Sequence, residues 1–207
     1  MPRSRPRLRL SQLEHVNRDA ILRAYARYAP VYDLVFGQAL DHGRRAMLRA
    51  VATEPVRRLL EVGVGTGLTL HRYPTTADVV GLDLSASMLD HARRRVRAKG
   101  LTNVTLICAD AENLPFADDS FDCVTLPYVL SVTPNPQRAM DELQRVCAPG
   151  GRIMIVNHFR GAGGWGWAES MISAFADRVG FDSMLDMDRG LGEHARRIER
   201  VDRVNLG

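Results

Sequence analysis

Short apolar runs alternate with helix-like segments through most of the chain. The runs have the length and the Val, Ile and Leu content of buried strands, and they lie at 58–64, 79–83, 104–108, 121–126 and 152–157. Segments with apolar residues at helical spacing lie between them, at 67–73, 85–99 and 135–147. Such alternation indicates an α/β fold with a mostly parallel sheet and helices on both of its faces.

Capping and turn residues support several of these boundaries. Ser85 is a preferred residue for the N-terminal cap of a helix, and Gly100 suits the C-terminal end of the same helix. Pro149 and the two glycines after it predict a sharp turn into the strand at 152–157. Beyond that strand the pattern predicts a loop at 161–166, a helix at 167–179 and a further strand at 195–205.

The N-terminal segment predicts an amphipathic helix behind a basic leader. On a helix its apolar residues share one face with arginines near both edges, and they are Leu13, Val16, Ala20, Ile21, Ala24 and Tyr28. We therefore divide the chain into residues 1–45, which form the basic amphipathic helix and a lid over a pocket, and residues 46–207, which form the α/β domain.

The positive charge of the chain is concentrated at its start. The formal net charge is +4, and residues 1–27 alone hold seven arginines against two acidic residues. A basic leader can contact nucleic acid or an anionic bilayer. Because an apolar face accompanies it, we expect binding to an anionic phospholipid membrane and none to nucleic acid. The alternative is a helix that only packs over the pocket.

Several classes of protein do not fit this sequence. No apolar run approaches the roughly 20 residues that cross a bilayer. The arginine-rich start lacks the apolar stretch of a secretion signal, so we expect a cytoplasmic protein, peripheral on the inner face of the membrane. Cys108, Cys123 and Cys147 are odd in number and lack CxxC spacing, which argues against disulfides and a zinc site.

Candidate binding residues follow the first three strands. The segment from Glu61 to Gly67, EVGVGTG, comes directly after the first strand, and its glycines allow a tight turn and close approach of a ligand. Asp83 ends the second strand, where a carboxylate can accept hydrogen bonds from both hydroxyls of a ribose. Asp110 and Ala111 follow the third strand, where they can meet an adenine edge. Together these positions predict an adenosine-containing ligand.

Each acid also has a purely structural interpretation. Glu61 could accept hydrogen bonds from loop amides, and Asp83 could cap the following helix. The joint spacing of glycines and acids, in a strand–turn–helix context, favours the ligand site.

The combined motifs resemble those of class I S-adenosylmethionine (SAM) dependent methyltransferases. The resemblance covers about residues 58–158 and rests on LEVGVGTG at 60–67, VGLDLSASML at 80–89, CADAENLPF at 108–116, SFDCV at 120–124 and APGG at 148–151. It implies a Rossmann-like fold and SAM as the cofactor, with S-adenosylhomocysteine as the product and no metal. The cofactor contacts that we expect are Glu61, Gly63, Gly65, Gly67, Asp83, Leu84, Met88, Asp110, Ala111, Leu126 and Tyr25. Similar proteins finish with a sixth strand and an antiparallel seventh, and the sequence up to Gly207 leaves no segment for that hairpin, which indicates a shortened chain or an unusual sheet edge.

A second resemblance concerns the acceptor. The segments YARYAPVYD at 25–33, LPYVLSVTPNP at 126–136 and NHF at 157–159 resemble bacterial phospholipid N-methyltransferases, which methylate phosphatidylethanolamine stepwise to phosphatidylcholine. Methyl transfer to an amine demands orientation and an unprotonated nitrogen, and aromatic faces stabilise the methylammonium that forms. The residues that we expect to act on the acceptor are Tyr28, Tyr128 and His158. Tyr25 and Tyr32 are further aromatic candidates, and for Tyr32 we favour the alternative, packing in the core with a satisfied hydroxyl.

Two alternatives stay open at this stage. One is a methyltransferase for a quinone precursor or another small molecule, since the core motifs are shared. The other is a noncatalytic module that binds SAM and a membrane. The GxGxG spacing makes a dinucleotide-dependent dehydrogenase less fitting than either, because dinucleotide sites usually show GxGxxG.

Overall fold

The computed structural model describes residues 40–157 and 191–202 of the chain. Five strands form one sheet in the order β3-β2-β1-β4-β5, and every neighbouring pair is parallel. They are β1 (Arg58–Val62), β2 (Asp78–Asp83), β3 (Val104–Cys108), β4 (Phe121–Pro127) and β5 (Cys147–Val156). The chain builds outward from β1 in one direction and from β4 in the other, so the sheet has a switch point between these two strands, where open α/β folds bind ligands.

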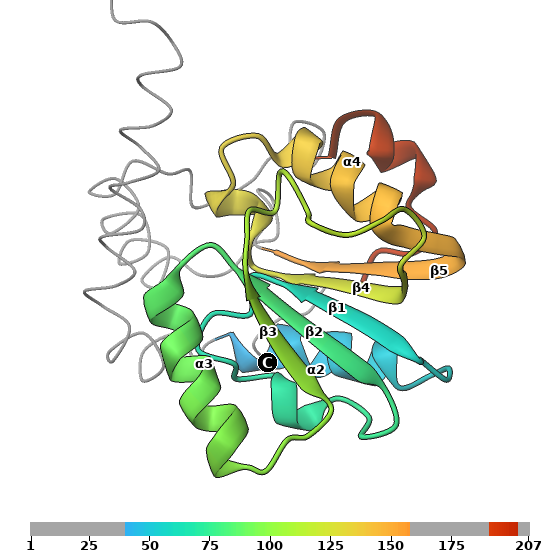
Figure 1. Cartoon of the computed structure of the whole chain (residues 1–207). Coiled ribbons are helices and arrows are strands. Elements are labelled where there is room, and N and C mark those ends of the chain that lie inside the picture. Colours follow the sequence, from blue (N-terminus) through green and yellow to red (C-terminus); the bar gives the residue numbers. More distant parts are fainter. Residues whose placement is uncertain (1–39, 158–190, 203–207) are drawn as a thin grey trace, which may run out of the picture.

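Helices cover both faces of the sheet (Figure 1). Helices α2 (Asp41–Val51) and α3 (Ala86–Ala98) pack on one face through Leu48, Val51, Leu89 and Ala92. Helix α4 (Pro136–Val146) packs on the other face through Met140, Leu143 and Val146. This arrangement confirms the expected Rossmann-like fold with helices on both faces.

Alternation along the central strand serves both layers. Leu59 faces the cluster under α2 and α3, whereas Leu60 and Val62 face the cluster under α4. All three side chains are fully buried. A strand that is apolar on both sides is typical of a parallel sheet between two helical layers.

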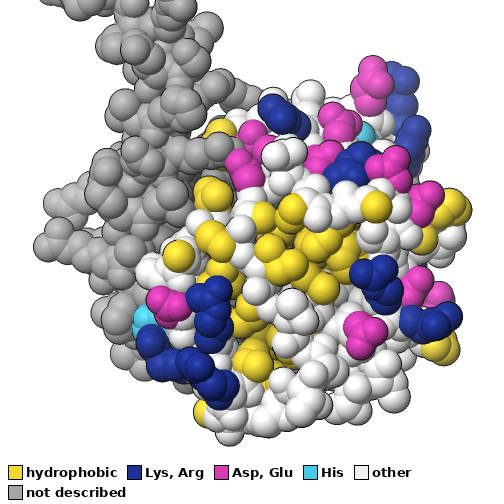
Figure 2. Space-filling view, in the orientation of Figure 1, with side chains coloured by type: hydrophobic (Ala, Val, Ile, Leu, Met, Phe, Trp, Pro, Cys, Tyr) yellow, Lys and Arg dark blue, Asp and Glu magenta, His cyan; other side chains and the backbone are white. Residues whose placement is uncertain are grey.

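The predicted cap of α3 is confirmed. The Ser85 hydroxyl accepts a hydrogen bond from the Met88 N–H, and Gly100 follows the helix with a φ of +61°. The basic residues near the end of α3 lie on the surface (Figure 2), with Arg94, Arg97 and Lys99 exposed. They complement the carbonyl end of the helix, as the sequence indicated.

Two predicted elements are wrong. The segment 67–73 is a turn followed by the short 3-10 helix η1 (Leu70–Arg72), because the positive φ of Gly67 and the following Pro74 leave no room for an α-helix. Residues 195–202, the described part of the strand predicted at 195–205, are not a strand, since the 3-10 helix η3 (Gly192–Arg197) begins before them and the chain continues without regular structure to residue 202. Helix η3 contacts α4 through a polar pair. His194 Nε2, on η3, lies 3.0 Å from Asp141 Oδ1, on α4.

Other expectations concern residues that lie outside the described part of the chain. These are the N-terminal helix at 13–28, the loop at 161–166 and the helix at 167–179. Helix α2 runs through residue 45, where the sequence suggested a division, so the division into 1–45 and 46–207 stays a prediction. Within residues 40–157 and 191–202, no helix has the length and apolar character needed to cross a membrane.

Helix α2 is held against the edge strand by an arginine. Arg152, on β5, donates from Nη1 to the Ala50 carbonyl at 3.1 Å and to the Thr53 hydroxyl at 3.0 Å. The bond to Ala50 satisfies one of the backbone carbonyl groups that a helix C-terminus leaves open. The two bonds fix the C-terminal end of α2 beside β5 at Arg152, which pairs with Cys123 in the first half of β4. The N-terminal end of this helix carries one side of the functional site.

Candidate functional site

A cleft opens where β1, β2 and β4 end. The loop after β1 forms its floor, the start of α3 forms one wall, and the segment after β4 forms the opposite wall. The position matches the switch point of the sheet, so backbone amides and the ends of several strands face the same space.

The three glycines after β1 play different parts. A Cβ on Gly63 would lie 2.0 Å from Val129 Cγ2, so the loop can pass the segment after β4 only with glycine there. Gly65 has a φ of +55° and open space where a Cβ would stand, on the side of the cleft. Gly67 has a φ of +80° and packs tightly against Leu70 and Ala92, and it does not line the cleft.

Asp83 is tied to both neighbouring turns. Its Oδ2 accepts a hydrogen bond from the Gly65 N–H at 2.8 Å, and its Oδ1 accepts one from the Ser85 N–H at 2.8 Å. Burial raises the pKa of this carboxyl, and the two backbone donors act in the opposite direction. Asp83 therefore both caps the turn before α3 and presents a carboxylate to the cleft.

The far end of the cleft is apolar with a polar rim. Leu84 is 38% exposed, Met88 is buried, and both line the cleft beside Asp83. Asp110 and Ala111, after β3, line it from the other side. Asp110 Oδ1 accepts the Glu112 N–H at 3.0 Å, within the turn that follows β3. The structure thus brings together the residues that the sequence assigned to an adenine ring.

Glu61 lies at the bottom of the cleft and is only 1% exposed. The Thr69 hydroxyl lies 2.6 Å from each of its carboxylate oxygens. Burial raises the pKa of Glu61 to about 7, against hydrogen bonds from Thr69 and Tyr73 and the charge of Arg44. The sequence suggested that loop amides would donate to Glu61 in a structural role. Its hydrogen-bond donors are instead the side chains of Thr69 and Tyr73.

Arg44 is a lining residue that the sequence analysis missed. It lies on α2, is 7% exposed, and its guanidinium carbon stands 5.8 Å from the centroid of the Tyr128 ring. The sequence does contain a sign of this role. Arg44 precedes Met47, Leu48 and Val51 by three, four and seven residues, so all four share the buried face of this helix. An arginine on an apolar face needs an anionic or aromatic partner.

Tyr128 connects the cleft to the start of α2. It has a φ of +61°, an uncommon conformation for a non-glycine residue and a frequent one at functional sites. Its N–H donates to the Val156 carbonyl at 2.6 Å, and its hydroxyl donates to the Leu40 carbonyl at 3.1 Å. A Cβ on Gly43 would lie 2.0 Å from that hydroxyl oxygen, so α2 meets the ring at a residue without a side chain.

The expectation for Leu126 is wrong. Leu126 is fully buried in the core under α4 and does not line the cleft. The next residues, Pro127, Tyr128 and Val129, form that wall, because successive side chains of a strand point to opposite faces and the chain leaves the sheet there. Tyr25, Tyr28, Tyr32 and His158 lie outside the described residues. In the part of the chain that is described, no cluster of His, Cys, Asp and Glu side chains is arranged to hold a metal.

Comparisons with known proteins show the family to which the chain belongs. The family of methyltransferase domains matches residues 60–155. The chain is similar to the phosphatidylethanolamine N-methyltransferase of Cereibacter sphaeroides, with 41% identity over 192 residues, which are 91% of this chain and 92% of that protein. It is also similar to the demethylmenaquinone methyltransferase of Thermus thermophilus, with 39% identity over 140 residues, 64% of this chain and 63% of that one.

Solved structures support the same class at the level of the fold. A SAM-dependent methyltransferase of Thermotoga maritima superposes with a TM-score of 0.59 at 23% sequence identity, over 80% of this chain and 74% of that one. The chain belongs to the class I SAM-dependent methyltransferases. Its cofactor is SAM.

The cleft fits this cofactor. The open space beside Gly65 admits a ligand against the backbone, and Asp83 stands next to it with a carboxylate that can accept the ribose hydroxyls. The apolar surfaces of Leu84 and Met88 suit a base, and the opposite charges of Arg44 and Glu61 suit the carboxylate and ammonium groups of a methionine moiety.

Proposed function

We propose that the protein is an N-methyltransferase that converts phosphatidylethanolamine stepwise towards phosphatidylcholine. The observation that carries this proposal is the extent of the similarity to the Cereibacter enzyme, which includes nearly the whole of both chains. The similarity to the menaquinone enzyme stops at about two thirds of each. Since acceptor choice depends on the segments around the shared core, similarity across those segments bears on the acceptor more than similarity within the core.

The cleft is compatible with an amine acceptor. SAM supplies an electrophilic methyl group, and the protein has to align an unprotonated nitrogen with it. We assign Tyr128 to the wall that faces the acceptor, because it lines the same cleft as Glu61 and stands next to Arg44. An aromatic face there stabilises a methylammonium product by cation–π attraction. Tyr28 completes this aromatic wall and His158 accepts the amine proton in our proposal.

The acceptor is tested with labelled SAM and mixed vesicles. Phosphatidylethanolamine and demethylmenaquinol are offered together, and thin-layer analysis is expected to show label in mono-, di- and trimethylated phosphatidylethanolamine. Tyr128→Ala is expected to slow this transfer more than it weakens SAM binding, because the ring acts chiefly on the acceptor. Label in the quinol alone would replace this acceptor with the quinone precursor, and the absence of label despite SAM binding would indicate a noncatalytic module.

We also propose that the basic leader docks the protein on the cytoplasmic face of the membrane. Each arginine near an anionic surface contributes about 1 kcal/mol, and salt screens the attraction. Replacing Arg3, Arg5, Arg7 and Arg9 by glutamine is therefore expected to remove most sedimentation with anionic vesicles at low salt.

The matched control removes the same charge from the surface of the core. It replaces Arg49, Arg94, Arg97 and Lys99, which are all exposed, by glutamine. If both variants lose vesicle binding equally, net charge and not the leader drives the association. If neither loses it, the N-terminal segment has no electrostatic role at the membrane.

A further inference from the structure

The loop between β3 and β4 forms part of the cofactor site, although it contains no helix or strand. Residues 109–120 contain no helix or strand beyond an isolated bridge between Asp110 and Asn113. The beginning of this loop, Ala109 to Ala111, lines the cleft at the end where the adenine ring is placed. Its conformation must therefore be set by contacts from elsewhere in the fold.

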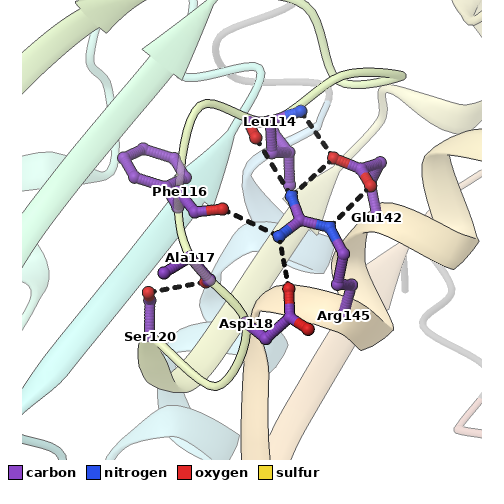
Figure 3. Close-up of polar contacts among 7 residues, drawn as sticks. All are labelled: Leu114, Phe116, Ala117, Asp118, Ser120, Glu142 and Arg145. Atoms are coloured by element: carbon purple, nitrogen blue, oxygen red, sulfur yellow. Dashed lines mark hydrogen bonds and ion pairs between the residues drawn. The ribbon is translucent and has the colours of Figure 1, made fainter.

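An arginine and a glutamate on α4 supply those contacts (Figure 3). Arg145 Nε and Nη2 each lie 2.8 Å from one carboxylate oxygen of Glu142, one helical turn earlier. Because the pair meets through two parallel hydrogen bonds, the guanidinium plane is fixed. This bonding holds the pKa of Glu142 below its usual range, with burial acting against it.

Glu142 and Arg145 form hydrogen bonds with the backbone of the loop. Leu114 is held at both of its polar atoms, since its N–H donates to Glu142 Oε2 at 2.7 Å and its carbonyl accepts from Arg145 Nη2 at 3.0 Å. Arg145 Nη1 donates to the Phe116 carbonyl at 2.8 Å. A further bond from Nη1 to Asp118 Oδ1, at 2.9 Å, reaches a side chain that is 74% exposed, where solvent weakens it.

The N-terminal end of α4 is also hydrogen-bonded to this loop. Glu112 Oε1 accepts the Asn135 N–H at 2.9 Å, and Asn135 is the residue that caps α4. Helix α4 itself is anchored in the core by Met140, Leu143 and Val146. Glu112 and Leu114 are thus tied to opposite ends of a rigid helix, three and five residues after Ala109.

We propose that Glu142 and Arg145 are positioning residues for the adenine end of the cofactor site. By fixing Leu114 and Phe116, they hold Ala109 to Ala111 in the conformation that meets the base. A loop that is already ordered loses less conformational freedom when a ligand binds, so the pair raises affinity and sharpens the recognition of the base edge. This inference rests on the placement of adenine at this end of the cleft and not on the identity of the acceptor.

The test measures ligand binding by calorimetry and needs no acceptor. Its probes are S-adenosylhomocysteine and S-inosylhomocysteine, which differ only at the base edge that the loop would meet. Arg145→Gln and Glu142→Gln are each expected to weaken the adenosyl ligand on the order of tenfold. Both are also expected to reduce the preference for it over the inosyl ligand. Asp118→Asn, which changes only the solvent-exposed partner of Arg145, is expected to keep the affinity and preference of the unmodified protein.

Two results would overturn the inference. One is a lower melting temperature for Arg145→Gln with unchanged affinity for both ligands. The other is an equal loss of affinity for both ligands, because a general loosening of the fold does not distinguish their bases. If Arg145→Gln does not fold by circular dichroism, Glu142→Gln provides the same readout with a smaller change. A failed phosphatidylethanolamine assay would leave these binding results unaffected.

Discussion

Asp83→Ala is expected to lower the affinity for SAM and S-adenosylhomocysteine by about 100-fold or more. The carboxylate would accept two charge-assisted hydrogen bonds from the ribose, each contributing about 1.5 kcal/mol at the lower limit. Since 1.4 kcal/mol corresponds to a tenfold change in affinity, their joint loss gives about two orders of magnitude. The substitution also releases Gly65, whose N–H donates to Asp83 Oδ2. Titration calorimetry measures the effect directly.

Two companion variants separate the causes of that loss. Asp83→Asn keeps the shape and removes the charge, so it is expected to retain part of the affinity. Asp78→Ala removes the same side chain from the opposite end of β2, away from the cleft, and is expected to bind like the unmodified protein. Unchanged affinity in Asp83→Ala would show that the ribose lies elsewhere.

Glu61→Gln is expected to flatten the pH dependence of stability between about pH 4.5 and 7. Burial raises the pKa of Glu61 to about 7 in the folded protein, from an ordinary value of 4.5. Below pH 4.5 the carboxyl is protonated in both states and carries no penalty. As the pH rises through this window, the unfolded chain releases its proton first, so the folded state loses stability, reaching about 3 kcal/mol above pH 7.

Urea unfolding at several pH values between 4 and 8 measures this contribution. The glutamine variant cannot ionise, so the difference in unfolding free energy between it and the unmodified protein is expected to grow with pH and then level off. Glu193→Gln makes the same substitution at an exposed position and serves as the control. Parallel curves for the Glu61 variant and the unmodified protein would mean that Glu61 ionises normally.

The elements that local chemistry determines could be predicted from the sequence. The strands at 79–83 and 104–108 match β2 and β3 to within one residue, and Ser85 caps α3 as expected. Errors arose where short apolar stretches lack a decisive local signal. Residues 195–205 have a strand-like composition, but packing against α4 and the bond from His194 to Asp141 favour a 3-10 helix at their start.

The site was predictable where a motif defines it and not where two distant elements meet. Asp83, Leu84, Met88 and Asp110 line the cleft as expected, because each follows its strand at a fixed offset. Arg44 lies between the motif at 25–33 and the motif at 60–67 and belongs to neither, and its role depends on α2 being held beside β4 and β5. Leu126 was predicted to line the cleft, and the residues directly after it line the cleft instead. This error is one step of strand alternation, since neighbouring side chains of a strand point to opposite faces.

The close approach at Gly43 links the evolutionary histories of three positions. A Cβ there would lie 2.0 Å from the Tyr128 hydroxyl oxygen and 2.7 Å from Val156 Cγ1. A lineage that acquires a larger residue at position 43 must therefore shrink its partner at 128 or 156, or let α2 move away from the cleft and take Arg44 with it. The three sites are expected to change together among natural relatives, so that substrate divergence in this branch of the family would pass through paired substitutions and not through single ones.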